Sequence, residues 1–201
     1  MSDLPQCRMP TSAQHPVITV VSGPPGSGKS TLAHTIAELV GYPAILRDEF
    51  KQGMVAATTP ARDSDYEDLN IPVLRTFFDV LTVLARNGVS AVAEAAFQDK
   101  LWRPNLERVA EFAEIRIIHC TAPQHVLHDR IAHRAEHDHH RRAHNDTDLL
   151  AEIAAGTRTA ASFVPVTMDA AQMTVDTTDG YEPGLDALAQ FVTAPSKRLS
   201  R

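Results

Sequence analysis

A glycine-rich segment that directly follows a β-branched run constrains this sequence more than any other feature. Residues 23–30 read Gly-Pro-Pro-Gly-Ser-Gly-Lys-Ser, and residues 17–21 before them are all β-branched, as expected for a buried strand. The spacing matches G-x-x-x-x-G-K-[ST], and a helical pattern begins near Lys29. Such a loop aims its backbone N–H groups inward, and the N-terminus of the following helix adds partial positive charge. The segment therefore predicts a cradle for nucleotide phosphates rather than a turn that binds nothing.

The residue types of this segment match the chemistry of phosphate binding. Lys29 can supply a point charge to the β- and γ-phosphates, and the hydroxyl of Ser30 can bind Mg²⁺. Lys29 is therefore expected to act in catalysis, and Ser30 to act as a metal ligand. We expect the nucleotide-binding residues to include Gly23, Pro24, Pro25, Gly26, Ser27, Gly28, Lys29, Ser30 and Thr31.

Strand-like and helix-like segments alternate along the chain. Strands are predicted at residues 17–21, 44–46, 89–93, 115–118 and 173–175, and helical patterns lie between several of them. This alternation predicts an α/β fold, with βαβ units, a mostly parallel sheet and helices on both of its faces. In such sheets ligands bind beyond the carboxyl ends of the strands, so the residues directly after each strand are the candidates for chemistry.

Length and charge limit the class of protein. The 201 residues fit one domain at residues 16–193, between a flexible lead at 1–15 and a short basic tail at 194–201. The net charge of −6 argues against a protein whose main function is to bind the backbone of nucleic acid. No apolar stretch is long enough to span a membrane or to form a secretory signal, and the two cysteines cannot build a disulfide framework. We expect a cytoplasmic protein without membrane contact, as a monomer or a homodimer.

Two acidic residues stand at predicted strand ends. Asp48 follows the strand at 44–46, where a carboxylate can accept the proton of an attacking hydroxyl; it can also cap the helix that follows, and the two roles are compatible. Glu94 follows the strand at 89–93, where an acid commonly organises Mg²⁺ through water, although Asp is the usual residue. Contact with a phosphoryl acceptor and an ordinary exposed acid are the alternatives for Glu94.

Two arginines indicate a lid over the nucleotide. Arg130 and Arg134 lie one helical turn apart and lead into a polar stretch. They predict a lid at about residues 134–148, whose arginines close over a triphosphate and neutralise charge in the transition state. A solvated basic face is the alternative.

The same stretch is rich in histidine. His133 and His137, and likewise His140 and His144, have the i,i+4 spacing of metal ligands on a helix. No HExxH motif and no cysteine accompany them, so we interpret them as a solvated, pH-sensitive surface of the lid.

Several of these motifs together resemble a known group of enzymes. They are residues 22–33, Arg47 to Glu49, Glu94, the Arg130-x-x-x-Arg134 pair, and Val175 to Thr177. Over roughly residues 17–193 the chain resembles small P-loop kinases of the AAA, zeta-toxin and polynucleotide-kinase type, and it is also similar to antibiotic O-phosphotransferases. The resemblance implies a P-loop NTPase three-layer sandwich, with a five-stranded sheet in the order 2-3-1-4-5 and a lid.

The resemblance also implies an activity and roles for single residues. Asp48 would be the general base, and Arg134 would contact phosphate as a catalytic arginine. ATP with Mg²⁺ is the implied nucleotide, and the N-K-x-D guanine signature of GTPase switches is absent. We therefore expect a kinase that transfers the γ-phosphoryl group of MgATP to a hydroxyl of a small molecule. The alternatives are a polynucleotide 5′-hydroxyl kinase and a regulatory ATPase that has no phosphoryl acceptor.

Overall fold

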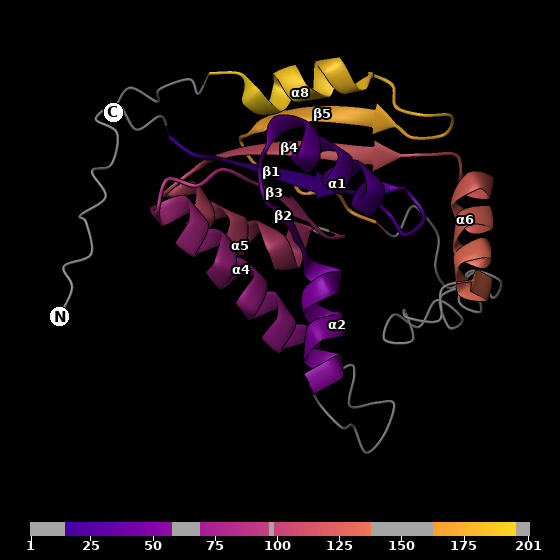
Figure 1. Cartoon of the computed structure of the whole chain (residues 1–201), viewed down its shortest axis with the longest axis horizontal. Coiled ribbons are helices and arrows are strands. Elements are labelled where there is room, and N and C mark those ends of the chain that lie inside the picture. The colour runs from indigo at the N-terminus through magenta and orange to yellow at the C-terminus, as the bar shows by residue number, and fades with distance from the viewer. Residues whose placement is uncertain (1–14, 58–68, 97–98, 138–162, 196–201) are drawn as a thin grey trace, which may run out of the picture.

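The computed structural model describes residues 15–57, 69–96, 99–137 and 163–195, and these residues form a layered α/β structure around one sheet (Figure 1). The strands are β1 (Val17–Ser22), β2 (Ala44–Leu46), β3 (Ala91–Glu94), β4 (Glu114–Thr121) and β5 (Ala171–Asp176). They lie in the order β2-β3-β1-β4-β5, and each pairing between neighbours is parallel. The predicted fold class and strand order are confirmed.

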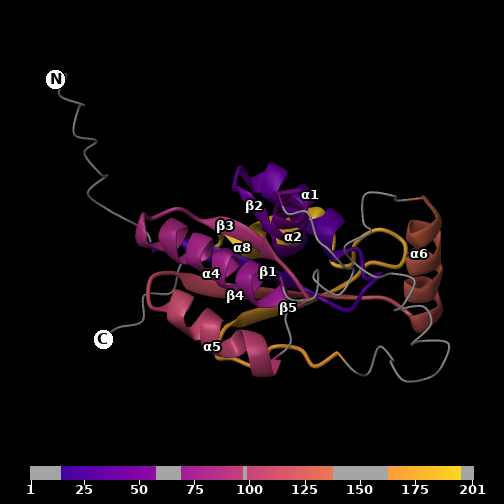
Figure 2. The same cartoon turned by 90° about the horizontal axis from the view of Figure 1, so that it is seen from below.

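Helices cover both faces of this sheet. Figure 2 shows α4 (Asn70–Arg86) and α5 (Asp99–Ala110) on the near face, with α1 (Lys29–Val40) and α8 (Leu185–Thr193) behind the sheet. Helix α2 (Arg47–Ala57) runs on directly from β2, and α6 (Gln124–His137) stands at the carboxyl end of β4 (Figure 1). The carboxyl edge of the sheet is therefore bordered by the starts of α1, α2 and α6.

Alternation along the strands divides the core in two. Ile18 and Val20 of β1 pack with α4 and α5, whereas Val21 packs with α1 and α8. All three side chains are fully buried, which is why apolar residues point to both faces of this strand rather than alternating with exposed polar ones.

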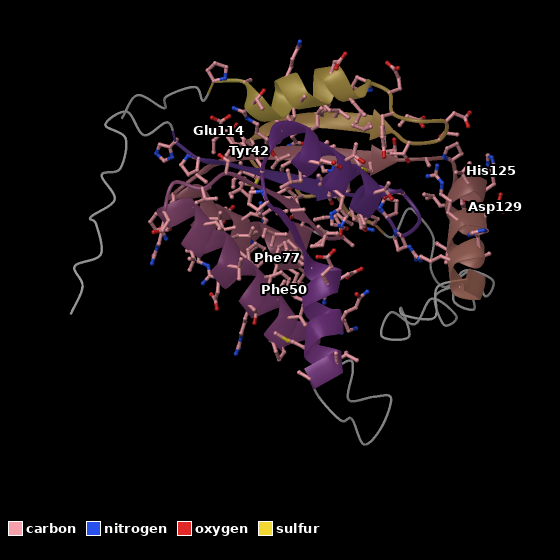
Figure 3. All side chains as sticks on the ribbon, viewed as in Figure 1. Tyr42, Phe50, Phe77, Glu114, His125 and Asp129 are labelled. Atoms are coloured by element: carbon pink, nitrogen blue, oxygen red, sulfur yellow. The ribbon has the colours of Figure 1, made fainter. Side chains whose placement is uncertain are left out.

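An aromatic cluster fixes the direction of α2. The ring of Phe77 in α4 meets Phe50 of α2 edge to face, with centroids 6.2 Å apart, and it meets Trp102 of α5 in the same way at 6.0 Å. Figure 3 shows Phe50 and Phe77 side by side between α2 and α4. Trp102 is 5% exposed, so it is part of the core.

The third strand begins two residues later and ends one residue later than predicted. Val89 is 37% exposed and its N–H binds the carbonyl of Leu84, so it belongs to the turn after α4. The strand instead includes Glu94, whose position in the ladder is opposite both Leu46 and Val21. Extended pairing, rather than β-branched composition alone, decides where this strand begins.

Parts of the predicted domain organisation lie outside the described residues. These are residues 1–14 of the expected lead, residues 196–201 of the expected tail, and residues 138–148 of the expected lid, including His140 and His144. The boundaries at 15–16, 193–194 and 134–148 therefore stay predictions. Within the part of the chain that is described, no helix combines the length and the apolar character needed to cross a membrane.

A buried arginine in β4 ties the sheet to the end of α8. The side chain of Arg116 is 3% exposed and pairs with the Glu114 carboxylate at 2.8 Å. Its guanidinium donates to the carbonyls of Phe191 at 2.7 Å, Val192 at 2.8 Å and Ala194 at 2.6 Å. Carbonyls at a helix C-terminus have no partner within the helix, and a cation there also interacts favourably with the helix dipole.

Replacing Arg116 by Met should lower the free energy of unfolding by about 2–4 kcal/mol, because buried helix carbonyls lose their charged donors. Arg103→Met is the control: Arg103 is 46% exposed and its Asp99 partner is 3.7 Å away. The control should change stability by less than about 0.5 kcal/mol. Urea unfolding followed by circular dichroism measures both variants. Equal stability of the two variants would contradict the structural role of Arg116.

Candidate active site

The loop between β1 and α1 is held close to α6. The N–H of Ser27 donates to the Pro24 carbonyl at 3.2 Å, which closes a tight turn. Gly26 has a φ of 80°, and a Cβ placed on it would lie 2.5 Å from the carbonyl oxygen of Leu127 in α6. Only glycine satisfies both the left-handed backbone and this close approach. The sequence pattern therefore reflects a contact with α6 as well as a turn.

One cavity of about 480 Å³ opens above this loop. Its lining contains Gly26, Gly28, Lys29, Ser30, Thr31, Arg130, Arg134, Thr177, Gly180 and Tyr181. Lys29, Arg130 and Arg134 give it positive charge, and none of the described residues that line it is acidic. Its size lies in the range of about 300–1,000 Å³ that is typical of small-molecule sites. The arrangement suits an anionic ligand.

The structure brings most of the predicted nucleotide-binding residues to this cavity. The loop from Gly26 to Thr31 and both arginines contribute, except that Ser27 is buried behind the lining. Gly23 is also buried, and Pro24 and Pro25 are half-buried outside the lining. Lining a cavity does not by itself show binding, so the nucleotide-binding roles predicted for all of these residues stay predictions.

Glu94 is buried beside the cavity. Its side chain is 1% exposed, so the interpretation as an ordinary exposed acid is wrong. The hydroxyl of Ser30 donates to Oε2 of Glu94 at 3.2 Å, and Nζ of Lys29 lies 3.9 Å from Oε1. Nζ of Lys29 also lies 3.5 Å from the Pro24 carbonyl oxygen. A buried carboxylate is stabilised by such a cation and donor, so Glu94 holds the start of α1 against β3.

Ser30 and Glu94 fit a Mg²⁺ ion by the nature of their oxygens. A hydroxyl and a carboxylate are donors that Mg²⁺ binds directly or through water, and here the fold brings the two within 3.2 Å of each other. Within the described part of the chain, no group of three or more His, Cys, Asp or Glu could hold a metal by itself. Mg²⁺ usually takes few protein ligands and completes its shell with water and phosphate oxygens.

Asp48 lies at the neighbouring strand end rather than in the cavity lining. Helix α2 begins at Arg47, so Asp48 is in its first turn instead of preceding it as a cap, and its charge is favourable there. The last residue of β2, Leu46, is opposite Glu94 in the sheet, which places Asp48 just beyond the ends of β2 and β3. Nη1 of Arg47 lies 3.5 Å from its Oδ1.

The guanidinium of Arg130 is engaged by backbone carbonyls at the edge of the cavity. Its Nη2 donates to the carbonyls of Thr177 at 2.6 Å and Thr178 at 3.1 Å. Arg134, one turn along α6, also reaches the cavity. Figure 3 shows His125 and Asp129 on the side of α6 that faces away from the sheet. Helical spacing correctly predicted that Arg130 and Arg134 share one face of α6, but it did not predict the carbonyl partners of Arg130.

Three lining residues had no predicted role. Thr177, Gly180 and Tyr181 belong to the segment after β5. The rule that ligands bind beyond the carboxyl ends of parallel strands could have identified them, because they follow a predicted strand.

The cysteine behind the loop adds no charge to the site. Cys120 of β4 is 1% exposed, and its carbonyl oxygen would be 2.6 Å from a Cβ on Gly23. Burial raises the pKa of the Cys120 thiol to about 12. The thiol is therefore protonated at neutral pH, and no thiolate opposes the binding of an anion.

Comparison with known proteins agrees with this geometry. The family model described as "AAA domain" matches residues 18–156. Uncharacterised proteins of Mycobacterium tuberculosis and Mycobacterium bovis are 31% identical over 147 residues, which is 69% of this chain and 28% of the relative. The chain thus spans little more than a quarter of the length of these curated relatives.

Solved structures share the fold at lower identity. A candidate kinase of Chloroflexus aurantiacus superposes with a TM-score of 0.78 at 21% identity, covering 92% of this chain and all of the other. A sugar kinase of Janibacter superposes with 0.57 at 22% identity, covering 90% and 96%. A gluconokinase of Sinorhizobium meliloti superposes with 0.51 at 20% identity, covering 90% and 92%. This chain therefore has the fold of small P-loop kinases and belongs to the AAA domain family.

Proposed function

We propose that this protein is a kinase that transfers the γ-phosphoryl group of MgATP to a hydroxyl of a small molecule. The observation that carries the proposal is the cationic cavity above the loop at 23–30, bordered by a buried carboxylate that binds Lys29 and Ser30. A protein that only binds nucleotide needs the phosphate-binding loop and nothing more. A kinase also needs a group that accepts the proton of the acceptor hydroxyl, and Asp48 just after β2 is the candidate for that role.

The triphosphate is bound by backbone and cationic groups. The amides of the loop and the N-terminus of α1 bind the phosphate chain, and Lys29 spans its β- and γ-phosphates. Arg134 approaches from α6 and neutralises the charge that develops during transfer. Mg²⁺, when bound at Ser30 and Glu94, supplies further neutralisation of the phosphate oxygens.

Asp48 acts as the general base in this proposal. It accepts the proton of the acceptor hydroxyl while the hydroxyl oxygen attacks the γ-phosphorus. The bond from the γ-phosphorus to the bridging oxygen breaks, and ADP leaves with that electron pair. Most of the rate enhancement comes from positioning and charge stabilisation, because phosphoryl transfer needs little covalent assistance from the protein.

The acceptor is proposed to be a small molecule rather than a polynucleotide. The net charge of −6 opposes the binding of a long polyanion. A sugar kinase and a gluconokinase share the fold, and a fold alone accommodates many acceptors.

Incubation with γ-labelled ATP, Mg²⁺ and a panel of sugars, nucleosides, antibiotics and 5′-hydroxyl oligonucleotides tests the proposal. We expect label on at least one small-molecule hydroxyl, and no transfer by Lys29→Ala, which loses phosphate affinity and activity together. Lys100→Ala, a change at an exposed lysine of α5, is the matched control and should behave as wild type. Release of free phosphate without any labelled acceptor would favour a regulatory ATPase, and labelling of oligonucleotides alone would favour the polynucleotide kinase.

Asp48→Asn should retain MgATP binding and lower the rate of phosphoryl transfer by about 10²–10⁴-fold, the range for loss of a general base. Calorimetry measures the binding, and single-turnover transfer to the identified acceptor measures the rate. Glu49→Gln is the control, since Glu49 is exposed and pairs with His34 at 3.1 Å. Near-normal turnover by Asp48→Asn would exclude Asp48 as the base.

Glu94→Gln should raise the Mg²⁺ concentration that gives half-maximal activity, because a neutral amide is a weaker partner for the ion than a carboxylate. High Mg²⁺ should restore part of the lost activity. Activity titrated against Mg²⁺ measures this, with the exposed Glu107→Gln on α5 as control. The same Mg²⁺ dependence in both variants would argue against a metal role for Glu94.

A further inference from the structure

The residue after β5 is joined to the phosphate-binding loop by a side-chain hydrogen bond. Thr177 is 4% exposed, and its N–H donates to the Thr121 carbonyl at 2.9 Å, which extends the β4–β5 pairing by one step. Its hydroxyl lies 2.9 Å from the Ser27 carbonyl oxygen and 3.1 Å from that of Thr121. A hydroxyl has one proton and donates to one carbonyl at a time. The shorter contact is the one to the loop.

Arg130 strengthens this contact from the other side. Its Nη1 donates to the Thr177 hydroxyl at 3.2 Å and lies 3.4 Å from the Gly26 carbonyl oxygen. A hydroxyl that accepts from a charged donor becomes a better donor itself, because hydrogen bonds in a chain polarise one another. The hydrogen bonds from Arg130 to Thr177 and from Thr177 to Ser27 therefore join α6, the end of β5 and the loop.

The Ser27 carbonyl decides where the next amide points. In a planar trans peptide, the C=O of one residue and the N–H of the next point in opposite directions. With the Ser27 oxygen held toward Thr177, the N–H of Gly28 points away from Thr177. Gly28 has a φ of 72° and no Cβ, so local sterics hold this peptide plane only weakly. A bond from outside the loop is needed to select one orientation.

We propose that Thr177 is a positioning residue, whose hydroxyl fixes the Ser27–Gly28 peptide so that the Gly28 N–H faces the bound phosphates. Thr177 acts through the backbone of the loop and not through contact with the reacting atoms. The inference rests on the proposed function, because it needs a phosphate chain in the loop. It also makes Arg130 a link between α6 and the loop, in addition to its predicted nucleotide contact.

Calorimetric titration with MgATP and with inorganic tripolyphosphate tests this role. Thr177→Val keeps the shape and removes the hydroxyl, and it should weaken both ligands by about tenfold, the effect of one hydrogen bond. Equal losses are expected, because the effect is on phosphate and not on the nucleoside. Thr177→Ser should restore affinity to within about threefold. Thr174→Val, at an exposed position of β5, is the matched control and should bind as wild type.

Unchanged affinity of Thr177→Val for both ligands would overturn the proposal, even if its melting temperature falls, since that pattern belongs to a residue with only a structural role. Failure of Thr177→Ser to restore binding would also overturn it. If Thr177→Val does not fold, Thr177→Ala removes the same hydroxyl without placing a methyl group against Ser27, and the same criteria apply. Absence of binding by the wild-type protein would instead refute the proposed function, and this inference with it.

Discussion

A buried carboxylate at the end of β3 organises the site. Glu94 is 1% exposed, and a carboxylate removed from water is stable only beside cations or hydrogen-bond donors. Lys29 and Ser30 meet this need from the first turn of α1, which fixes that turn against the sheet. Glu94 in turn gives Lys29 a counter-charge, so the gathering of Lys29, Arg130 and Arg134 around one cavity costs less free energy.

The sequence predicts the features that depend on residues close together along the chain. The β-branched run before Gly23 and the spacing from Gly23 to Ser30 are local patterns, and they predicted β1, the loop and the start of α1. Strand–helix alternation predicted the parallel sheet, and the family resemblance implied its order. The third strand was misplaced because exposed Val89 has the same β-branched character as a strand residue.

The contacts that complete the site join residues far apart in the chain. Ser30 and Glu94 are 64 positions apart, and Thr177 and Ser27 are 150 positions apart. Neither the burial of Glu94 nor the hydroxyl contact of Thr177 follows from composition or periodicity. The spacing of Arg130 and Arg134 predicted a shared helix face, but the carbonyls that Arg130 binds belong to a loop whose approach only the fold determines.

Different packing interactions hold the two parts of the proposed site, which are the phosphate-binding loop at 23–30 and the proposed general base Asp48. The phosphate-binding loop is held by α6 and the end of β5, through Arg130 and Thr177. Asp48 is placed by α2, which packs on α4 through Phe50. Arg47 beside it donates to Asn70 of α4 at 3.0 Å and lies over Trp102 of α5. The two parts meet at the pairing of β2 with β3. Substitutions in α4 can therefore shift Asp48, which we propose as the general base, while the hydrogen bonds that Arg130 and Thr177 make to the loop stay intact.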